Sequence, residues 1–319
     1  MKAAVYYENG LPSVFRYEDV ADPTPGPDQV LIRVEAVSIE GGDVLRRATA
    51  KPPTTPYVVG YQAGGTVAAV GKGVTQFRPG DRVVGFNVAQ GSHAELHVTP
   101  VVSTYSVPPG FDMIKAAAMP VAWGTAHNCL FERGRLQSGE TVLVQGGASG
   151  VGLAAIQLAK RAGARVFATA SSPEKLARLA AFGLDEGINY RSEDVVARVK
   201  ALTGGKGVDV VVDPVGGAVT QGSMQALAYN GRLSWVGRAS RESSVLDLSV
   251  LSGGNKSITG VLYEGMSEAG HAMTQRLIDE AARGELQVVI DKVFPLSQAA
   301  EAHAYIESRQ AVGRVILTP

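Results

Sequence analysis

A glycine-rich loop between a predicted strand and a predicted helix constrains this chain more than any other feature. The strand at residues 141–145 leads into residues 146–152 (GGASGVG), and a helical pattern follows to residue 162. Such a loop presents backbone N–H groups and the positive end of a helix dipole, which together bind a diphosphate. Its spacing has one residue more than the usual G-x-G-x-x-G. We predict a dinucleotide site formed by Gly147, Ala148, Ser149, Gly150, Val151 and Gly152.

The order of the predicted elements divides the chain near residue 120. Short β-branched runs separated by Pro- and Gly-rich turns fill the first part, a spacing typical of a barrel or sandwich. Later, apolar runs of strand length alternate with helical patterns, which predicts a parallel sheet covered on both faces. The sequence therefore predicts an α/β protein of two domains, in agreement with its length of 319 residues.

The first part is expected to hold strands at residues 3–8, 30–37, 65–70, 82–86 and 94–98. In the second part we expect strands at residues 141–145, 165–169, 187–190, 208–213, 232–236 and 257–263. Helices are expected there at residues 151–162, 173–182, 192–202 and 218–228. The final segment is expected to form a helix at 272–283, a strand pair at 286–294 and 314–317, and a helix at 298–308.

Charge and composition exclude several classes of function. The 30 Lys and Arg residues balance the 30 Asp and Glu residues, so no basic field is available for nucleic acid or an anionic membrane. No apolar run reaches the ~18 residues of a membrane span, and the N-terminus lacks a signal-length apolar stretch, which predicts a cytoplasmic protein. The single cysteine, Cys129, rules out an internal disulfide and a cysteine-based zinc cluster.

The residues after the second strand of the parallel sheet indicate which dinucleotide binds. NAD sites usually place an acidic residue there, about 20 residues past the glycine loop, to hold the ribose hydroxyls. Here Ser171 and Ser172 follow the strand, and either can cap the next helix. Lys175 lies one turn on, and Glu174 is better explained as a capping partner of Ser171. Hydroxyls and an ammonium suit a 2′-phosphate, so we predict NADPH. Tyr190, which ends the third strand, supplies a further phenol or packs at the sheet edge.

Several stretches together give the chain a resemblance to a known family over nearly its whole length. It resembles the medium-chain dehydrogenase/reductase superfamily, and within it the zinc-independent quinone oxidoreductase (zeta-crystallin-like) branch. Besides the glycine loop, the matching stretches are residues 70–83 (VGKGVTQFRPGDRV), 136–144 (LQSGETVLV), 170–176 (ASSPEKL), 188–191 (INYR) and 207–217 (GVDVVVDPVGG).

The resemblance implies a GroES-like β-barrel catalytic domain (residues 1–120 and 264–319) around a Rossmann domain with a doubly wound parallel sheet (residues 121–263). It also implies bound NADPH and a homodimer, for which the strand at residues 257–263 is the expected interface. Residues matching Lys175 and Tyr190 hold the 2′-phosphate in such proteins. Thr125, Val215, Val236 and Gly237 match positions along the cofactor, and Thr125, Val236 and Gly237 match those beside the nicotinamide.

The metal ligands of the zinc-dependent relatives are missing. Those relatives use a Cys, a Gly-His-Glu motif and a second Cys, whereas this chain has Glu40 and Gln62 in the corresponding stretches, Ser-Ile-Glu and Gly-Tyr-Gln. His93 and His97 are expected on one strand, roughly 13 Å apart at ~3.3 Å per residue, too far for one ion. We predict no metal site.

A hydride acceptor must then stabilise its own developing negative charge. Quinones and α,β-unsaturated carbonyls do so by delocalisation, and they need only positioning and one or two hydrogen bonds. We predict an NADPH-dependent quinone reductase, with an enone or 2-alkenal reductase, or an NADPH-binding structural or sensor protein with little turnover, as alternatives. A metal-free alcohol dehydrogenase is disfavoured because the matched cleft has no His or Lys base.

The candidate catalytic residues are Glu40, Gln62, Tyr57 and Tyr263. Glu40 acts as a general acid if burial raises its pKa or orients ribose hydroxyls, or it forms a local ion pair with Arg46 or Arg47. Gln62 donates its amide to a carbonyl oxygen or stabilises a turn. Tyr57 and Tyr263 are phenols near the expected cleft, and solvent is an alternative proton donor.

Overall fold

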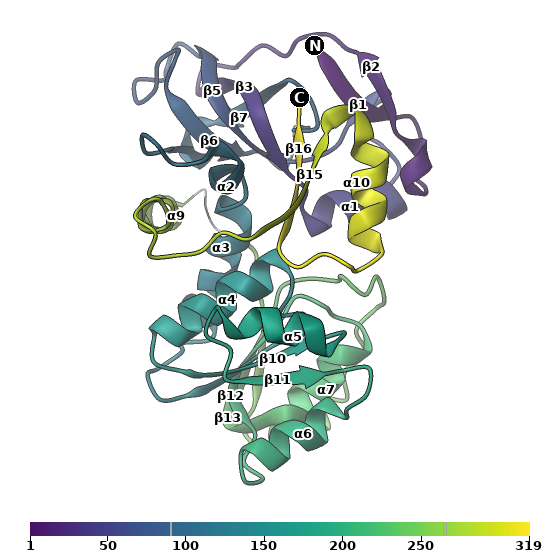
Figure 1. The fold of residues 1–319 in the computed structure, drawn as a ribbon, viewed down its shortest axis with the longest axis vertical. Helices are drawn as coiled ribbons and strands as arrows, with labels where there is room; N and C mark the ends of the chain where they lie inside the picture. The colour runs from purple at the N-terminus through teal and green to yellow at the C-terminus, as the bar shows by residue number, and fades with distance from the viewer. Residues whose placement is uncertain (90, 264, 266) are drawn as a thin grey trace. The chain divides into compact units, whose positions relative to one another are not determined.

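The computed structural model describes residues 1–89, 91–263, 265 and 267–319, and the chain forms two compact units (Figure 1). Unit 1 comprises Met1–Gly124 and Glu264–Pro319, and unit 2 comprises Thr125–Tyr263. The boundary expected at residue 120 is the first residue of helix α3 (Pro120–His127), which contributes residues to both units. The other expected boundary, residue 264, lies outside the described residues.

Two sheets form unit 1. The larger has the strand order β15-β16-β3-β5-β6-β8, with β7 paired to β3, and the smaller has the order β2-β1-β4. All five strands expected in the N-terminal part are present, and the pairs are antiparallel apart from β15 with β16. The strands of this unit are β1 (Lys2–Tyr6), β2 (Arg16–Asp19), β3 (Gln29–Ser38), β4 (Tyr57–Val58), β5 (Gln62–Val70), β6 (Arg82–Phe86), β7 (Leu96–Pro100), β8 (Thr104–Ser106), β15 (Ile290–Pro295) and β16 (Arg314–Thr318).

Alternation along β3 shows why this strand is central. Its even-numbered residues Val30, Ile32, Val34 and Ala36 are buried, while Arg33 and Glu35 between them are exposed. The close pairing with β5 requires a glycine, because a Cβ on Gly65 would lie 2.0 Å from the Arg33 carbonyl oxygen. The hydrophobic pattern therefore fixes the register of the two longest strands of this sheet.

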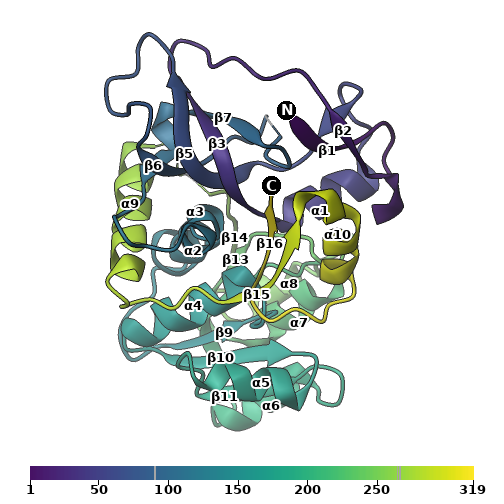
Figure 2. The same ribbon diagram turned by 45° about the horizontal axis from the view of Figure 1, so that its top comes forward.

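Helices cover the sheets of unit 1. Besides α3, they are α1 (Gly41–Thr49), α2 (Met113–Ala117), α9 (Glu268–Ala282) and α10 (Ala299–Glu307). Figures 1 and 2 both show α1 beside α10, although α1 ends at residue 49 and α10 begins only at residue 299. An ion pair between the fully buried Arg47 of α1 and Glu307 of α10 joins the two helices.

Unit 2 contains one six-stranded, fully parallel sheet with the order β11-β10-β9-β12-β13-β14. Its strands are β9 (Thr141–Val144), β10 (Arg165–Ala170), β11 (Glu186–Asn189), β12 (Val208–Asp213), β13 (Leu227–Trp235) and β14 (Ser257–Gly260). Its helices are α4 (Gly150–Arg161), α5 (Pro173–Ala180), α6 (Val195–Leu202), α7 (Ala218–Ala226) and α8 (Ser249–Ser252). Helices α4 and α5 lie on one face and α6 and α7 on the other (Figure 1). All six predicted strands and all four predicted helices are present.

The strand order of unit 2 reverses between β9 and β12. The chain runs outward from β9 through β10 to β11, then returns to β12 and continues to β14. In open α/β sheets, ligands bind outside the carboxyl ends of the strands at such a switch point. The apolar core behind it includes Leu143, Phe167, Val211 and Met224, all fully buried. The fold therefore predicts a ligand site at the loops after β9, β10, β12 and β13.

Among the described residues, no helix combines the length and apolar character needed to cross a membrane.

Candidate functional site

The glycine loop lies between β9 and α4, at the switch point of unit 2. Gly146 has a φ of +62°, and its N–H donates to the Thr169 side-chain oxygen (3.0 Å). The Gly147 N–H donates to the Thr169 carbonyl (2.8 Å). A Cβ on Gly152 would lie 2.4 Å from the Gly146 carbonyl oxygen, so position 152 accepts only glycine without rearrangement. These contacts hold the loop tightly against the end of β10.

The start of α4 offers backbone donors at the same place. Ser149 is the N-cap, and its side-chain oxygen accepts the Gly152 N–H (3.0 Å). Gly150 and Val151 begin the helix, so their N–H groups have no carbonyl partner in a preceding turn. Free N–H groups at the positive end of a helix, together with close backbone approach at Gly152, fit the diphosphate of a dinucleotide such as NADPH.

Hydroxyl groups and cations lie at the carboxyl ends of β10 and β11. The Tyr190 N–H donates to the Ala170 carbonyl (3.2 Å), which sets Tyr190 beside the loop that contains Ser171. Ser172 is the N-cap of α5 and accepts the Lys175 N–H (3.4 Å). The residues present therefore fit a 2′-phosphate, with hydroxyls on one loop and an ammonium one turn into the helix.

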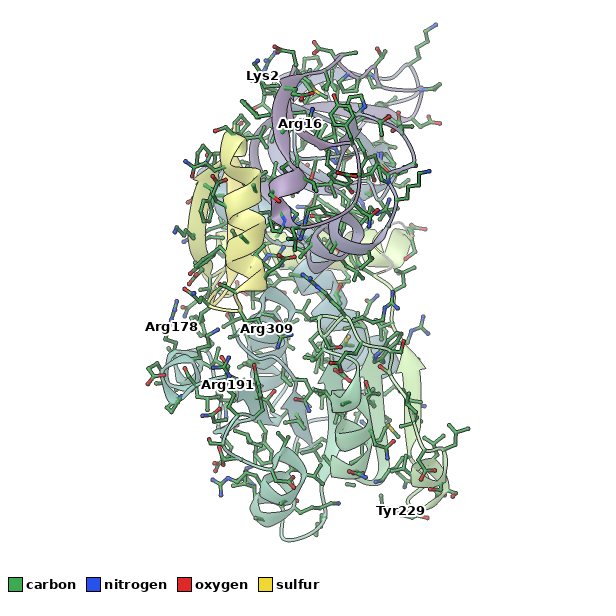
Figure 3. All side chains as sticks on the ribbon, turned by 90° about the vertical axis from the view of Figure 1, so that its right-hand side faces the viewer. Lys2, Arg16, Arg178, Arg191, Tyr229 and Arg309 are labelled. Carbon is green, nitrogen blue, oxygen red and sulfur yellow. The ribbon has the colours of Figure 1, made fainter. Side chains whose placement is uncertain are left out.

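Helix α5 is capped by one of the two serines expected to cap it. Ser172, not Ser171, caps the helix, so the expected capping box of Ser171 with Glu174 is wrong. A hydrogen bond from Ser172 instead lowers the pKa of the exposed Glu174 carboxyl. Sequence reasoning also missed two exposed arginines, Arg178 and Arg191, which project on the same side of this unit (Figure 3). The sequence did contain a signal for them, because Arg178 lies one helical turn after Lys175 and Arg191 directly follows Tyr190.

The loops after β12 and β13 meet at the same carboxyl edge. Asp213 ends β12, and its buried carboxylate accepts the N–H groups of Val215 (2.9 Å) and Gly216 (3.0 Å) and the Thr220 hydroxyl (2.9 Å). Across the edge, the Val236 N–H donates to the Asp213 carbonyl (3.0 Å). A Cβ on Gly237 would lie 2.6 Å from the Pro214 carbonyl oxygen. The structure thus brings together Val215, Val236 and Gly237, three of the residues expected along a cofactor.

Thr125, the fourth residue of that group, lies on α3 and is buried in unit 2. Helix α3 was not predicted from the sequence, because its hydrophobic residues show almost no preference for one face of the helix. The chain continues from α3 into one turn of π-helix over Asn128–Arg133. Cys129 is fully buried in this turn, and burial raises the pKa of its thiol to about 12. Cys129 is therefore an apolar core residue at physiological pH.

Glu40 and Gln62, two predicted catalytic residues, lie in one buried polar network in unit 1. Arg314, the first residue of β16, makes an ion pair with the Glu40 carboxylate and donates to the Ser38 hydroxyl (2.6 and 3.0 Å) and the Ile39 carbonyl (2.8 Å). Glu40 is 3% exposed and Arg314 9% exposed. The partner of Glu40 is thus Arg314, 274 residues away, and not Arg46 or Arg47.

The Gln62 side-chain amide is fully used inside this network. Its Nε2 donates to the Ala117 carbonyl (2.6 Å) and to Glu40 Oε1 (3.3 Å). Its Oε1 accepts the Val121 N–H (2.8 Å). These bonds account for both amide hydrogens and the carbonyl oxygen, so Gln62 holds the start of α3 and the Glu40 carboxylate together.

A second buried carboxyl lies next to Glu40. Asp43, at the third position of α1, accepts the Glu40 N–H at Oδ2 (2.8 Å). Burial raises the pKa of Asp43 well above its usual value, and the nearby Glu40 charge adds to the effect. Burial also raises the pKa of Glu40, although Arg314 opposes this. A phenol not predicted as a site residue, Tyr61, also lies here, with its oxygen 2.9 Å from where a Cβ on Gly42 would be.

The two predicted tyrosines belong to different units. Tyr57 lies on β4 in unit 1, where its hydroxyl accepts a hydrogen bond from Arg46 Nη1 (3.0 Å) and its ring packs edge-on against Tyr6. That contact leaves the Tyr57 hydrogen available for donation. Tyr263 is the last residue of unit 2 and follows β14. Within unit 1, no hydrogen bond between described residues connects Tyr57 to the Glu40 network.

The histidines of unit 1 are core residues. His93 and His303 are fully buried and face one another with their Nε2 atoms 3.1 Å apart. Burial lowers the pKa of His93 to about 3 and that of the equally buried His97 to about 4. Among the described residues, no three His, Cys, Asp or Glu side chains are grouped so that they can hold a metal ion.

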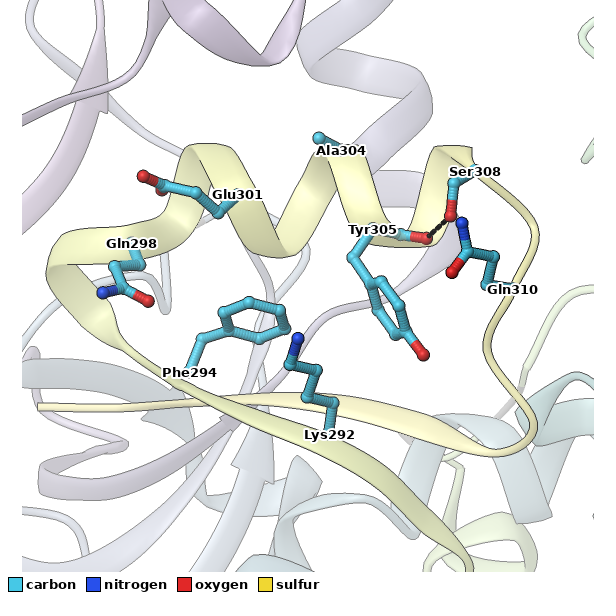
Figure 4. A pocket seen from close by; sticks show the side chains of 8 residues that line it. All are labelled: Lys292, Phe294, Gln298, Glu301, Ala304, Tyr305, Ser308 and Gln310. Atoms are coloured by element: carbon cyan, nitrogen blue, oxygen red, sulfur yellow. Dashed lines mark hydrogen bonds between the residues drawn. The ribbon is translucent and has the colours of Figure 1, made fainter.

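A shallow groove of about 520 Å³ lies between β15 and α10 in unit 1 (Figure 4). The Lys292 ammonium lies over the rings of Phe294 (4.7 Å to the centroid) and Tyr305 (5.0 Å). The Tyr305 hydroxyl donates to Asp291 (2.7 Å). None of the predicted site residues lines this groove.

Comparison with known proteins identifies both units. Residues 26–109 match the family of alcohol dehydrogenase GroES-like domains, and residues 150–283 match the family of zinc-binding dehydrogenases. A quinone oxidoreductase from Pseudomonas aeruginosa is 35% identical over 97% of this chain and 97% of its own length. A 2-haloacrylate reductase from a Burkholderia species is 32% identical over 99% of this chain and 98% of its own.

A solved structure agrees with these matches. A mycobacterial protein complexed with NADPH superposes with a TM-score of 0.94 at 33% identity, covering all of both chains. The predicted fold class, a GroES-like domain and a Rossmann sheet, is thereby confirmed, as is the family resemblance. The chain belongs to the quinone oxidoreductases of the medium-chain dehydrogenase/reductase superfamily.

Proposed function

We propose that this protein is an NADPH-dependent oxidoreductase that reduces quinones without a metal. One observation carries the proposal: the glycine loop at the switch point is followed, at the ends of β10 and β11, by Ser171, Ser172, Lys175 and Tyr190. These groups favour a nucleotide with a 2′-phosphate, and named relatives at this identity are quinone oxidoreductases.

NADPH, when bound, supplies a hydride to the acceptor. The chain's own part in the reaction is to bind and orient the two molecules and to stabilise negative charge on the acceptor oxygen. On the cofactor side we assign the loop residues 147–152 to the diphosphate. Thr125, Val215, Val236 and Gly237 are assigned to the half that carries the nicotinamide.

On the acceptor side we assign Glu40, Gln62, Tyr57 and Tyr263. Glu40 and Gln62 act through position, because their polar atoms bond within unit 1 and fix the start of α1 and of α3. Tyr57 keeps a hydrogen to donate to the acceptor oxygen, since its own oxygen accepts from Arg46. Tyr263 is the proposed second phenol. Solvent delivers the proton if neither phenol does.

Reduction of an activated double bond is the second candidate. It is favoured by the relative named as a 2-haloacrylate reductase, which matches almost the whole chain. An α,β-unsaturated carbonyl that accepts hydride places the same kind of delocalised charge on oxygen, so the same residues serve both reactions.

We further propose that the two units have different roles in the reaction and that the chain forms a homodimer. Unit 2 carries the cofactor residues and Tyr263, and unit 1 carries the other acceptor-side residues, Glu40, Gln62 and Tyr57. The chain forms a homodimer in the cytoplasm through β14, which pairs with β13 on one side and with no described strand on the other. An unpaired edge strand is a template for pairing with a second copy.

The test is NADPH oxidation followed by absorbance with a quinone panel and an enone panel. We expect turnover with quinones, and NADPH preferred over NADH. Turnover with enones alone would select the second candidate. Tight NADPH binding with no turnover on either panel would indicate a structural or sensor protein, and failure of both nucleotides to bind would overturn the proposal.

A further inference from the structure

An exposed arginine lies at the carboxyl edge of unit 2, on the half of the sheet assigned to the nicotinamide. Arg238 comes directly after Val236 and Gly237, in the loop that leaves β13. The switch point between β9 and β12 divides the carboxyl edge of the sheet into two halves. The loops after β12 and β13 lie on one half, and the loop after β10, with Ser172 and Lys175, lies on the other.

Backbone hydrogen bonds fix the position of the Arg238 main chain. The Ala239 N–H donates to the Pro214 carbonyl (3.3 Å) and the Ser240 N–H to the Val215 carbonyl (2.9 Å). The Arg241 N–H donates to the Arg238 carbonyl (2.8 Å) and closes a turn. A Cβ on Gly216 would lie 3.3 Å from the Arg238 Cα. Arg238 is thus held against the β12 loop, next to Val215.

The charge of Arg238 is not neutralised by the described residues around it. Its side chain makes no hydrogen bond or ion pair with any residue in the described part of the chain. The Asp213 carboxylate at the end of β12 is occupied by three donors. The Glu242 carboxylate lies against Gly217, with Oε2 2.9 Å from where a Cβ on that glycine would be. The positive charge of Arg238 therefore remains exposed on this half of the edge.

We propose that Arg238 selects acceptors that carry an anionic group, a carboxylate or sulfonate, next to the reducible system. This inference rests on the proposed function, because it places the acceptor at the nicotinamide half of the edge. A guanidinium presents a planar fork that matches a carboxylate or sulfonate, and it stays charged at any physiological pH. Because Arg238 is exposed, the expected effect is about two- to fivefold in acceptor affinity, and it weakens as salt rises.

The experiment compares 1,4-naphthoquinone with 1,4-naphthoquinone-2-sulfonate. KM and kcat are measured at saturating NADPH for the wild-type protein and for the Arg238→Ala, Arg238→Lys and Lys206→Ala variants, at low and high salt. Lys206 is an exposed cation before β12, at the amino end of the same sheet, so Lys206→Ala removes the same charge away from the site. Binding of the sulfonate in the presence of NADP⁺ is measured by calorimetry, because no turnover occurs with the oxidised nucleotide.

For Arg238→Ala we expect a two- to fivefold rise in KM and in the calorimetric Kd for the sulfonate, with kcat and the uncharged quinone unchanged. Arg238→Lys should retain most of the wild-type affinity, and Lys206→Ala should behave as wild type. Equal effects on both quinones, or none on either, would overturn the assignment of Arg238 while the proposed function stands. If the wild-type protein reduces neither quinone, the proposed function fails, and the calorimetric comparison alone decides whether Arg238 binds the anion.

Discussion

Replacing Arg314 with Met removes the only described cation that pairs with the buried Glu40 carboxylate. Removing one partner of a buried ion pair typically costs about 3–5 kcal/mol, since the remaining charge is left in an apolar environment. Both side chains are at least nine-tenths buried, so this range applies without a reduction for solvent screening. The Ile39 carbonyl also loses its donor. We therefore expect Arg314→Met to lower the free energy of unfolding of unit 1 by about 3–5 kcal/mol at pH 8.

The loss should depend on pH in a defined direction. Burial raises the pKa of the Glu40 carboxyl, and without Arg314 nothing opposes that effect. A carboxyl whose pKa is raised in the folded state gives stability at low pH that is lost as pH rises past its unfolded value, about 4.3. The difference in free energy of unfolding between the variant and the wild type should therefore be smallest at pH 5 and larger at pH 8.

The assay is urea unfolding followed by tryptophan fluorescence. The chain has two tryptophans, Trp123 in unit 1 and Trp235 in unit 2, so a Trp235→Phe background lets fluorescence report on unit 1 alone. The control is the double variant Arg314→Met with Glu40→Gln, which removes the unpaired charge and should recover at least half of the loss. A loss below about 1 kcal/mol, or a double variant no more stable than the single one, would refute the reasoning.

Three further predictions concern the cofactor loop, the 2′-phosphate and the buried histidines. Gly152→Val should abolish NADPH binding by fluorescence titration while circular dichroism shows retained secondary structure, since its Cβ meets a loop carbonyl at 2.4 Å; normal binding would contradict the tight loop. Lys175→Ala should weaken NADPH binding about tenfold, as expected from loss of one charged hydrogen bond, and leave NADH binding unchanged; equal weakening of both nucleotides would count against a 2′-phosphate contact. Burial lowers the pKa of His93 to about 3, so as pH falls this histidine is protonated in the unfolded chain before it is protonated in the folded chain. The free energy of unfolding should therefore decrease as pH falls below about 6.5. By pH 5 the decrease in the free energy of unfolding is about 2 kcal/mol per histidine, measured by thermal or urea unfolding. The His93→Gln variant should lose less stability over this pH range than the wild type, and an equal loss in both proteins would contradict the prediction.

The features that sequence reasoning predicted well are local ones. The glycine loop, the strand before it and the helix after it are encoded by adjacent residues. Strand β12 appears with the predicted bounds because the valine-rich segment Val208–Asp213 (VDVVVD) lies before a turn. The hydroxyls and ammonium that follow β10 are likewise close in sequence, so their grouping needed no knowledge of the fold.

The features that it missed depend on distant contacts or on weak local signals. One of the roles expected for Glu40 was an ion pair with an arginine six or seven residues away, but its partner comes from the last strand of the chain. The contact between His93 and His303 spans 210 residues. Helix α1 begins with two glycines, which are poor helix formers, and is stabilised by the Asp43 side chain and by packing against α10. None of these partners can be identified without the three-dimensional fold.

The position of β16 determines when unit 1 can be completed during synthesis. This strand follows unit 2 in the sequence, yet it lies between β15 and β3 and supplies the arginine that pairs with Glu40. On the ribosome, the continuous segment that forms unit 2 emerges whole and is free to fold, while the N-terminal sheet must wait with one edge open. A variant that lacks β16 should therefore contain a complete unit 2, while the larger sheet of unit 1 would lack the strand between β15 and β3.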